Sequence, residues 1–133
     1  MNVLVDTSAF LAVLDRDDAN HAAAGAVWEN LNQGESGLVF HNYVMVETSA
    51  VILRRLGVEA LRVFERDVVP VLEIVWVPRE IHEAAAGAQL VAGRRDLSLV
   101  ECVSFEVMRR TGLNTAFAFD RHFEEFGYER IPV

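Results

Sequence analysis

Short apolar runs alternate with longer amphipathic stretches along this chain. The runs are rich in valine, leucine, isoleucine and phenylalanine, which is typical of buried strands, and we expect strands at residues 2–5, 38–40, 73–77, 116–119 and, at a sheet edge, 131–133. Helices are expected at residues 9–14, 18–31, 43–56, 59–68, 79–92 and 98–111. Strands separated by helices require crossover connections, so they run parallel. The sequence therefore predicts an α/β fold, with a central parallel sheet of four to five short strands and helices on both faces.

The composition is that of a folded protein with an ordinary core. A chain of 133 residues is long enough to fold as one domain, residues 1–133. Hydrophobic residues make up 52% and charged residues 24%, which excludes disorder, and no apolar run approaches the ~20 residues of a membrane span. The start lacks the basic segment of a signal peptide, and the single cysteine, Cys102, can form no internal disulfide. We therefore expect a cytoplasmic protein in which Cys102 is a small core residue.

The net charge of −8 argues against a protein that binds nucleic acid through overall basicity. All twelve basic residues are arginine, and some are paired, as at 54–55, 94–95 and 109–110. Arginine binds phosphate bidentately, so local patches could guide a polyanion; the alternative is a compositional bias toward arginine, with solvated pairs. Receiver domains and enzymes that form an aspartyl phosphate usually place a lysine against the phosphate. This chain has no lysine, which disfavours both classes.

Four acidic residues lie where a surface role explains them poorly. Asp6 and Asp120 directly follow apolar runs, whereas Glu47 and Glu101 interrupt apolar helical stretches. In a parallel sheet the ligand crevice lies beyond the carboxyl ends of the strands, so we expect Asp6 and Asp120 at one mouth. Carboxylates that converge without a basic partner need a cation. A divalent metal bound by oxygens is the simplest one, which points to magnesium-dependent hydrolysis.

Each of the two strand-end acids has an alternative role. Asp6 precedes a helix and is a suitable N-cap, although Thr7 or Ser8 could cap the helix instead. Asp120 could likewise cap a short helix that follows it. His122 is close to Asp120 in sequence, but a histidine at such a position is usually solvated, and metal-assisted hydrolysis needs no histidine base. We therefore leave His122 out of the predicted catalytic set.

Glu47 is predicted to point toward the core. On a helix its face includes Val44, Ala50 and Val51, and a buried carboxylate must be neutral, paired or bound to a metal. The alternative partner is Arg54 or its neighbour, which lie about two helical turns away. A site role is therefore favoured for Glu47.

Glu101 has the strongest alternative role. The sequence Ser98-Leu99-Val100-Glu101 matches a capping box, in which the glutamate accepts a hydrogen bond from the N-cap amide. Capping and metal binding would then compete for one side chain, and Asp96 is the replacement ligand. A set of phenylalanines at helical and strand spacing is expected to be core rather than a platform for nucleobases: Phe105, Phe117, Phe119, Phe123 and Phe126.

The chain resembles PIN-domain ribonucleases of the VapC toxin kind from end to end. The resemblance is carried by VLVDTS at residues 3–8, VET at 46–48, DLSLVECVSF at 96–105 followed by Met108, and AFDRHF at 118–123. It implies a parallel sheet and a four-acid site, made by Asp6, Glu47, Glu101 and Asp120, for magnesium or manganese. It also implies single-stranded or loop RNA as substrate, a small antitoxin protein that blocks the groove, and a homodimer.

One residue departs from the family pattern. The family normally has aspartate where this chain has Glu101, so the carboxylate extends about one methylene further from the backbone. Magnesium demands near-octahedral geometry, so this change could weaken activity. This departure keeps one alternative to a toxin ribonuclease open, a catalytically weakened PIN-like module that binds RNA or protein. Another alternative, a pure protein-interaction subunit, rests on the high apolar fraction, which suggests an apolar surface covered by a partner.

Overall fold

The computed structural model describes residues 1–133 and has a five-stranded parallel sheet at its centre. The strand order is β3-β2-β1-β4-β5, and every neighbouring pair is parallel. The strands are β1 Asn2–Val5, β2 Gly37–His41, β3 Glu73–Val75, β4 Thr115–Phe117 and β5 Glu129–Ile131. The predicted α/β fold with a parallel sheet is confirmed.

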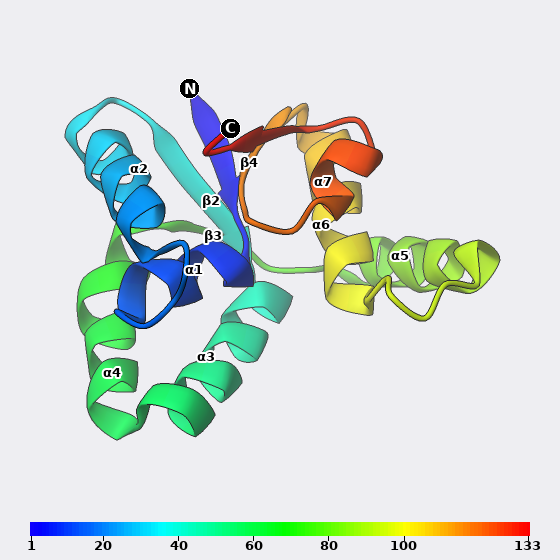
Figure 1. The fold of residues 1–133 in the computed structure, drawn as a ribbon. Helices are drawn as coiled ribbons and strands as arrows, with labels where there is room; N and C mark the ends of the chain where they lie inside the picture. The colour runs from blue at the N-terminus through cyan, green and yellow to red at the C-terminus, as the bar shows by residue number, and fades with distance from the viewer.

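Helices cover both faces of this sheet (Figure 1). The helices α1 to α4 lie on one side, and α5, α6 and α7 lie on the other. Their bounds are α1 Thr7–Leu14, α2 His21–Gln33, α3 Asn42–Leu56, α4 Val58–Val63, α5 Arg79–Ala92, α6 Leu99–Thr111 and α7 His122–Glu125. A π-helical turn, Phe64–Val68, and a 3₁₀ turn, Val69–Val71, continue from α4. No helix is both long and apolar enough to span a bilayer.

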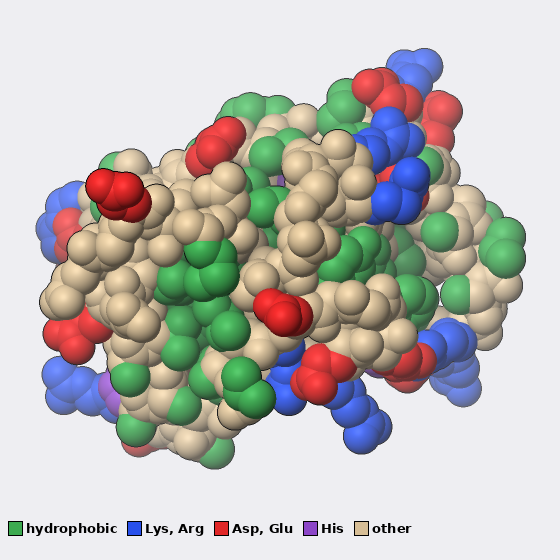
Figure 2. Space-filling model, turned by 90° about the horizontal axis from the view of Figure 1, so that it is seen from above, with side chains coloured by type: hydrophobic (Ala, Val, Ile, Leu, Met, Phe, Trp, Pro, Cys, Tyr) green, Lys and Arg blue, Asp and Glu red, His purple; other side chains and the backbone are tan.

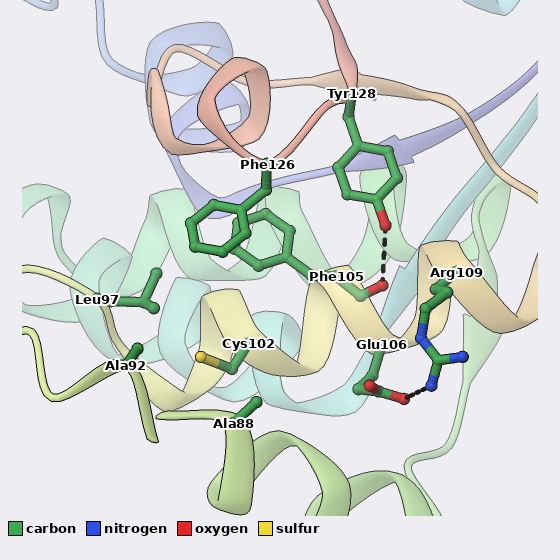
Figure 3. A pocket seen from close by; sticks show the side chains of 9 residues that line it. All are labelled: Ala88, Ala92, Leu97, Cys102, Phe105, Glu106, Arg109, Phe126 and Tyr128. Atoms are coloured by element: carbon green, nitrogen blue, oxygen red, sulfur yellow. Dashed lines mark hydrogen bonds and ion pairs between the residues drawn. The ribbon is translucent and has the colours of Figure 1, made fainter. Parts of the chain in front are cut away.

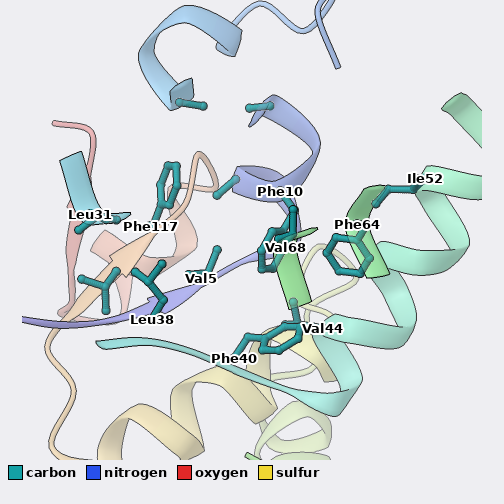
Figure 4. Close-up of a cluster of buried hydrophobic side chains, with 14 residues drawn as sticks. Val5, Phe10, Leu31, Leu38, Phe40, Val44, Ile52, Phe64, Val68 and Phe117 are labelled. Atoms are coloured by element: carbon teal, nitrogen blue, oxygen red, sulfur yellow. The ribbon is translucent and has the colours of Figure 1, made fainter. Parts of the chain in front are cut away.

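The central strand β1 supplies side chains to a separate core on each face. Val3 and Val5 point into the cluster under α1 to α4, and Leu4 points into the cluster under α5 to α7, because successive strand residues face opposite sides. In the first cluster Phe10 packs edge-on against Phe40 and Phe64, with ring centroids 5.6 and 5.4 Å apart (Figure 4). Burying β1 on both faces explains why its sequence is continuously apolar.

The structure differs from the predicted elements mainly at the edges. The last strand ends at Ile131 rather than spanning 131–133, because Pro132 has no amide hydrogen for a ladder. The third strand ends at Val75, and the side chain of Trp76 is exposed. Helix α7 is the short helix raised as an alternative after Asp120, and its four residues carry too little periodicity to predict its bounds.

The face at the amino ends of the strands, near both chain termini, is shown in Figure 2. Acidic and arginine side chains are intermixed there with hydrophobic patches, and no broad basic surface is visible. The opposite end of the sheet is where β1 leads into α1 and β2 leads into α3 (Figure 1). The acidic residues singled out in the sequence belong to that carboxyl end.

Candidate metal centre

Asp6 is positioned by the junction between β1 and α1. It is the N-cap of α1, and its Oδ2 accepts hydrogen bonds from the Ser8 amide at 3.1 Å and the Ser8 hydroxyl at 2.6 Å. The capping alternative is therefore confirmed, but the pKa of Asp6 is still raised to about 6. Burial is the main cause, opposed by the bonds from Ser8 and reinforced by the negative charges of Glu47 and Asp120. Asp6 thus lies among like charges.

Asp6 and Asp120 are brought together by strand adjacency. β1 pairs with β4, with Val5 opposite Phe117 in the register. Beyond the paired residues, the amide of Phe119 donates to the Ser8 hydroxyl oxygen at 3.0 Å, which ties the segment before Asp120 to the start of α1. The predicted convergence of these two acids at the carboxyl end of the sheet agrees with this geometry.

Glu101 uses its two carboxylate oxygens for different purposes. Oε1 accepts from the amide and hydroxyl of Ser98, at 3.1 and 3.2 Å, which completes the predicted capping box. Oε2 lies 2.6 Å from Nδ1 of His122. Burial raises the pKa of Glu101, the hydrogen bond from His122 opposes this, and Asp120 adds to the rise. Capping therefore leaves one oxygen of Glu101 directed at the site.

His122 lies inside the acidic cluster, and the prediction of a solvated side chain is wrong. Only 12% of the side chain is exposed, and its Nδ1 is 3.2 Å from Oδ1 of Asp120 as well as being bonded to Glu101. The pKa of His122 is raised, chiefly by the hydrogen bond to Glu101. Ligand atoms of Glu101, Asp120 and His122 all lie within 4.8 Å of one another, close enough to share an ion.

Asp120 also supports the start of the short helix α7, whose N-cap is Arg121. Its Oδ1 accepts from the amide of His122 at 2.9 Å, the first residue of α7. Nη1 of Arg130 donates to the carbonyl of Phe119 at 2.9 Å and supports the same segment from β5. Because Asp120 holds the start of α7, it also places the ring of His122 against α6.

Glu47 of α3 is less buried than predicted. Its charge adds to the rise in the pKa of Asp6, but it is not among the residues whose ligand atoms lie within 4.8 Å of one another. It is half-buried, and Ala50, which was expected on the same buried face, is exposed. No salt bridge joins Glu47 to Arg54, so that alternative is not seen. Glu47 instead borders an open groove of about 410 Å³ between α3 and α6, whose apolar lining includes Val46 and Val100.

Asp96 lies at the rim of the cluster. Its Oδ2 is 2.9 Å from Nη2 of Arg94, which also pairs with Glu125, and 3.3 Å from Nε2 of His122. The hydrogen bond from Arg94 is the main reason that the pKa of Asp96 is lowered. Since Glu101 keeps an oxygen free of the capping box, the reason for invoking Asp96 as a replacement ligand is removed.

A second cavity, of about 220 Å³, lies between α5, α6 and the chain that follows α7 (Figure 3). Phe105 stacks on Phe126 and Tyr128 beside it, with ring centroids 4.6 and 5.9 Å apart, and Phe126 is 42% exposed. The prediction that Phe126 is core is therefore wrong. The acid in this cavity, Glu106, is paired with Arg109 at 2.7 Å, so the cavity has no free carboxylate for a cation. Cys102 is buried, as expected.

The donor set at the carboxyl end of the sheet fits a hard divalent cation. Carboxylate oxygens are the ligands that magnesium and manganese prefer, and a nearby imidazole is compatible with manganese. The raised pKa values of Asp6 and Glu101 show that the folded chain disfavours their negative charge. A bound cation would reverse that preference, because it interacts favourably with the ionised form.

Comparison with known proteins gives a consistent family. Residues 3–128 match the PIN domain model. The chain is 28% identical over 130 residues to "23S rRNA-specific endonuclease VapC20" of Mycobacterium tuberculosis strain CDC 1551, covering 97% of both chains. The crystal structure of Mycobacterium tuberculosis VapC20, described as a sarcin-ricin loop cleaving toxin, superimposes with a TM-score of 0.83 at 29% identity and covers 95% of both chains.

Another solved structure shows the same fold at greater sequence distance. It is VapBC2 from Rickettsia felis bound to a DNA fragment from their promoter, at 10% identity and a TM-score of 0.69, covering 98% of this chain and 97% of that one. The resemblance inferred from the sequence motifs is confirmed, and the chain belongs to the PIN domain family.

Proposed function

We propose that this protein is a divalent-metal-dependent endoribonuclease. Asp6, Glu47, Glu101 and Asp120 would hold magnesium or manganese and form the catalytic centre. The observation that carries the proposal is the burial of Asp6 among like charges from α3 and the segment after β4, which raises its pKa to about 6. Burying a carboxylate beside other carboxylates costs free energy. In a PIN domain, a bound cation explains this arrangement, because it would neutralise the negative charges.

The residues of the site have separable roles in hydrolysis. The ion would neutralise the phosphodiester and activate water as the nucleophile. Ser8 orients the carboxylate of Asp6 through two hydrogen bonds, and Ser98 orients that of Glu101. His122 contacts both Glu101 and Asp120, so it fixes the rotamers of two acids at once.

RNA is the proposed substrate, in a single-stranded or loop region. The support is the relative named as a 23S rRNA-specific endonuclease and the similar structure described as a sarcin-ricin loop cleaving toxin. A net charge of −8 means that overall basicity does not attract RNA to this protein. The cation at the acidic cluster would supply attraction for the phosphate at the position where it reacts.

We further propose that the chain is the toxin of a type II toxin-antitoxin pair and acts in the cytoplasm as a homodimer. One PIN domain would span residues 1–133, and a small antitoxin protein would block the groove. The similarity to VapC20, described as a toxin, supports this assignment. Co-expression with the product of an adjacent short reading frame should relieve growth inhibition if the assignment holds.

A cleavage assay with the purified chain tests the nuclease proposal. Single-stranded and stem-loop RNA should be cut in the presence of Mg²⁺ or Mn²⁺ and left intact with EDTA. Asp6→Asn should remove cleavage, whereas Glu59→Gln, at an exposed acid paired with Arg62, should not. Cleavage that persists in EDTA, or that survives Asp6→Asn, would contradict the proposal.

Glu101 favours one second candidate, a PIN module that binds RNA or protein but cleaves weakly. Its carboxylate is longer than the family's aspartate, and one of its oxygens is occupied by the capping box. The two candidates differ in one measurement. A weakened module would bind Mn²⁺ and RNA but cut RNA only slowly even when saturated with the metal, whereas the nuclease would cut at a rate that rises with metal occupancy.

A further inference from the structure

The separation of two site helices is not set by apolar packing at the site alone. Helix α3 carries Glu47 and α6 carries Glu101, and the groove of about 410 Å³ lies between them. Val46 of α3 is 64% exposed in this groove, so the apolar packing between the helices, in which Val100 packs against the cluster of Val44, is incomplete at this level. A further contact between α3 and α6 also bears on the distance between the two acids.

That contact is a buried hydrogen bond between His41 and Ser104. His41 ends β2 and is the N-cap of α3, with no exposed surface. Its Nδ1 accepts from the amide of Val44 at 3.3 Å, and its Nε2 lies 2.8 Å from Oγ of Ser104, which is also fully buried. The Ser104 hydroxyl donates to the carbonyl of Val100 at 3.1 Å. Every polar atom of the pair thus has a partner within the chain.

These partners define one protonation state of His41. Nδ1 must be unprotonated to accept from Val44, so Nε2 carries the hydrogen and donates to Ser104. Burial lowers the pKa of His41 to about 4, which agrees with a neutral ring. Burying an imidazole and a hydroxyl is more costly than burying apolar side chains of similar size, so their contribution lies in a defined geometry more than in stability.

Both ends of this bond are connected to site carboxylates by short stretches of helix. Ser104 lies three residues after Glu101, about one turn of α6, and His41 caps the helix that carries Glu47. A second buried bond joins α3 to α1, from the Thr48 hydroxyl to the Thr7 hydroxyl at 3.1 Å. Thr48 follows Glu47 directly, so α3 is held at two points beside the cluster.

We propose that His41 and Ser104 are positioning residues, whose hydrogen bond sets the separation of Glu47 from Glu101 and thereby the affinity of the site for its metal ion. The inference rests on the proposed function, because it assigns a purpose to the spacing of the same four acids. Both side chains are fully buried, which leaves no surface for contact with RNA. They act by fixing α3 relative to α6, and a small displacement of a ligand-bearing helix is expected to weaken metal binding.

Two substitutions of His41 separate its two hydrogen bonds. His41→Asn keeps a good N-cap for α3, but its side chain is too short to reach Ser104. His41→Gln is long enough to donate to Ser104 and gives up the cap. Ser104→Ala removes the bond from the other side, and the double variant His41→Asn with Ser104→Ala completes a cycle. Ile52→Val, a buried change elsewhere on α3, is the control for loss of stability alone.

Mn²⁺ binding to the full chain, measured by calorimetry without RNA, is the primary readout. His41→Asn and Ser104→Ala should each weaken Mn²⁺ binding about 10-fold. His41→Gln should stay within about 3-fold of the wild type. The double variant should be no weaker than the weaker single variant, because both changes remove one bond. In RNA cleavage the same two single variants should lose kcat about 10-fold with little change in KM.

Several outcomes would overturn the positioning role. Mn²⁺ affinity that is unchanged in His41→Asn and Ser104→Ala while the melting temperature falls would reduce the bond to ordinary core stabilisation. The positioning role would also be contradicted if Ile52→Val lost as much Mn²⁺ affinity as His41→Asn and Ser104→Ala. The same holds if the losses of Mn²⁺ affinity in the two single variants were fully additive in the double variant. If the wild-type chain itself neither binds Mn²⁺ nor cleaves RNA, the proposed function fails first, and that result differs from a defect confined to the variants.

Discussion

Two sets of polar side chains, the pair of His41 and Ser104 and the acids around Asp6, differ in how their atoms are satisfied. In the pair of His41 and Ser104, each polar atom has a hydrogen-bond partner within the chain. In the cluster around Asp6, the nearest charges include two further carboxylates, those of Glu47 and Asp120. A buried polar group that is fully partnered holds the scaffold together, whereas one surrounded by like charge indicates a ligand from outside.

The same difference appears in the response to pH. Burial lowers the pKa of His41 and so favours its neutral form, which its partners require. Burial also raises the pKa of Asp6, but its like-charged neighbours act in the same direction instead of relieving it. His122 has the opposite environment from His41, because contact with Glu101 raises its pKa. The four predictions that follow test this contrast, from the largest effect to the smallest.

Asp6→Asn should separate activity from stability most clearly. Cleavage should fall about 1000-fold, because the site loses its most buried ligand. In EDTA at neutral pH, the free energy of unfolding should instead rise by about 1–3 kcal/mol. Asp6 is ionised in both folded and unfolded chains above pH 6, and only the folded chain pays for burying the charge. The asparagine side chain still caps α1, because its oxygen can accept the hydrogen bond from the amide of Ser8.

Urea denaturation in EDTA and in Mn²⁺ measures this effect. Mn²⁺ should stabilise the wild type and leave Asp6→Asn nearly unchanged, since only a chain that binds the ion gains stability from it. If Asp6→Asn is less stable than the wild type in EDTA, Asp6 stabilises the fold through its hydrogen bonds, as His41 does.

Glu101→Gln should separate the two roles of this side chain, capping α6 and contributing an oxygen to the site. The amide oxygen can still accept from Ser98, so the free energy of unfolding should change by less than about 1 kcal/mol. Cleavage should fall about 100-fold, because the oxygen that faces His122 and Asp120 is replaced by an amide NH2, which carries no charge and cannot bind a cation. Glu101→Ala, the matched change, should cost about 1 kcal/mol of stability in addition to the activity. Equal activity of Glu101→Gln and the wild type would confine Glu101 to capping.

His41 should make the fold sensitive to acid in a defined window. Between pH 6.5 and about 4 the unfolded chain takes up a proton at this histidine and the folded chain does not, so stability decreases as the pH falls. The stability difference between wild type and His41→Asn should therefore shift by about 3 kcal/mol across this window. Comparing the two chains cancels Asp6, whose pKa shift acts in the opposite direction. If the free energies of unfolding of the wild type and His41→Asn change in parallel between pH 6.5 and about 4, His41 is not held neutral in the folded chain.

Arg94→Gln should have the smallest effect. Arg94 pairs with Asp96 and Glu125 at the rim, where all three side chains are at least one-third exposed. Exposed pairs contribute little, so the free energy of unfolding should fall by less than about 1 kcal/mol, and high salt should reduce the difference further. Cleavage should stay within about 3-fold of the wild type. A loss as large as that of Glu101→Gln would place Arg94 in the site, where it would contact phosphate.

Sequence periodicity was sufficient for most of the scaffold. Apolar runs followed by acids predicted β1 and the position of Asp6, and the rule for parallel sheets placed Asp120 near it without knowledge of the strand order. The capping box at Ser98 and Glu101 was also readable, because its residues are three apart and need only local geometry. The strand and the capping box depend on contacts within one strand or one helix turn, whereas the approach of Asp120 to Asp6 followed from a general rule of parallel sheets.

Tertiary structure decided what helical periodicity could not. The face of α3 that carries Glu47 was predicted to be buried, but α6 stands off from it across a groove, so Glu47 is only half-buried. His122 reaches Glu101 across 21 residues and His41 reaches Ser104 across 63. Local sequence determined which segments become strands and helices. Only the packing of those segments decided which polar atoms meet, because a hydrogen bond between distant elements leaves no periodic signal in either one.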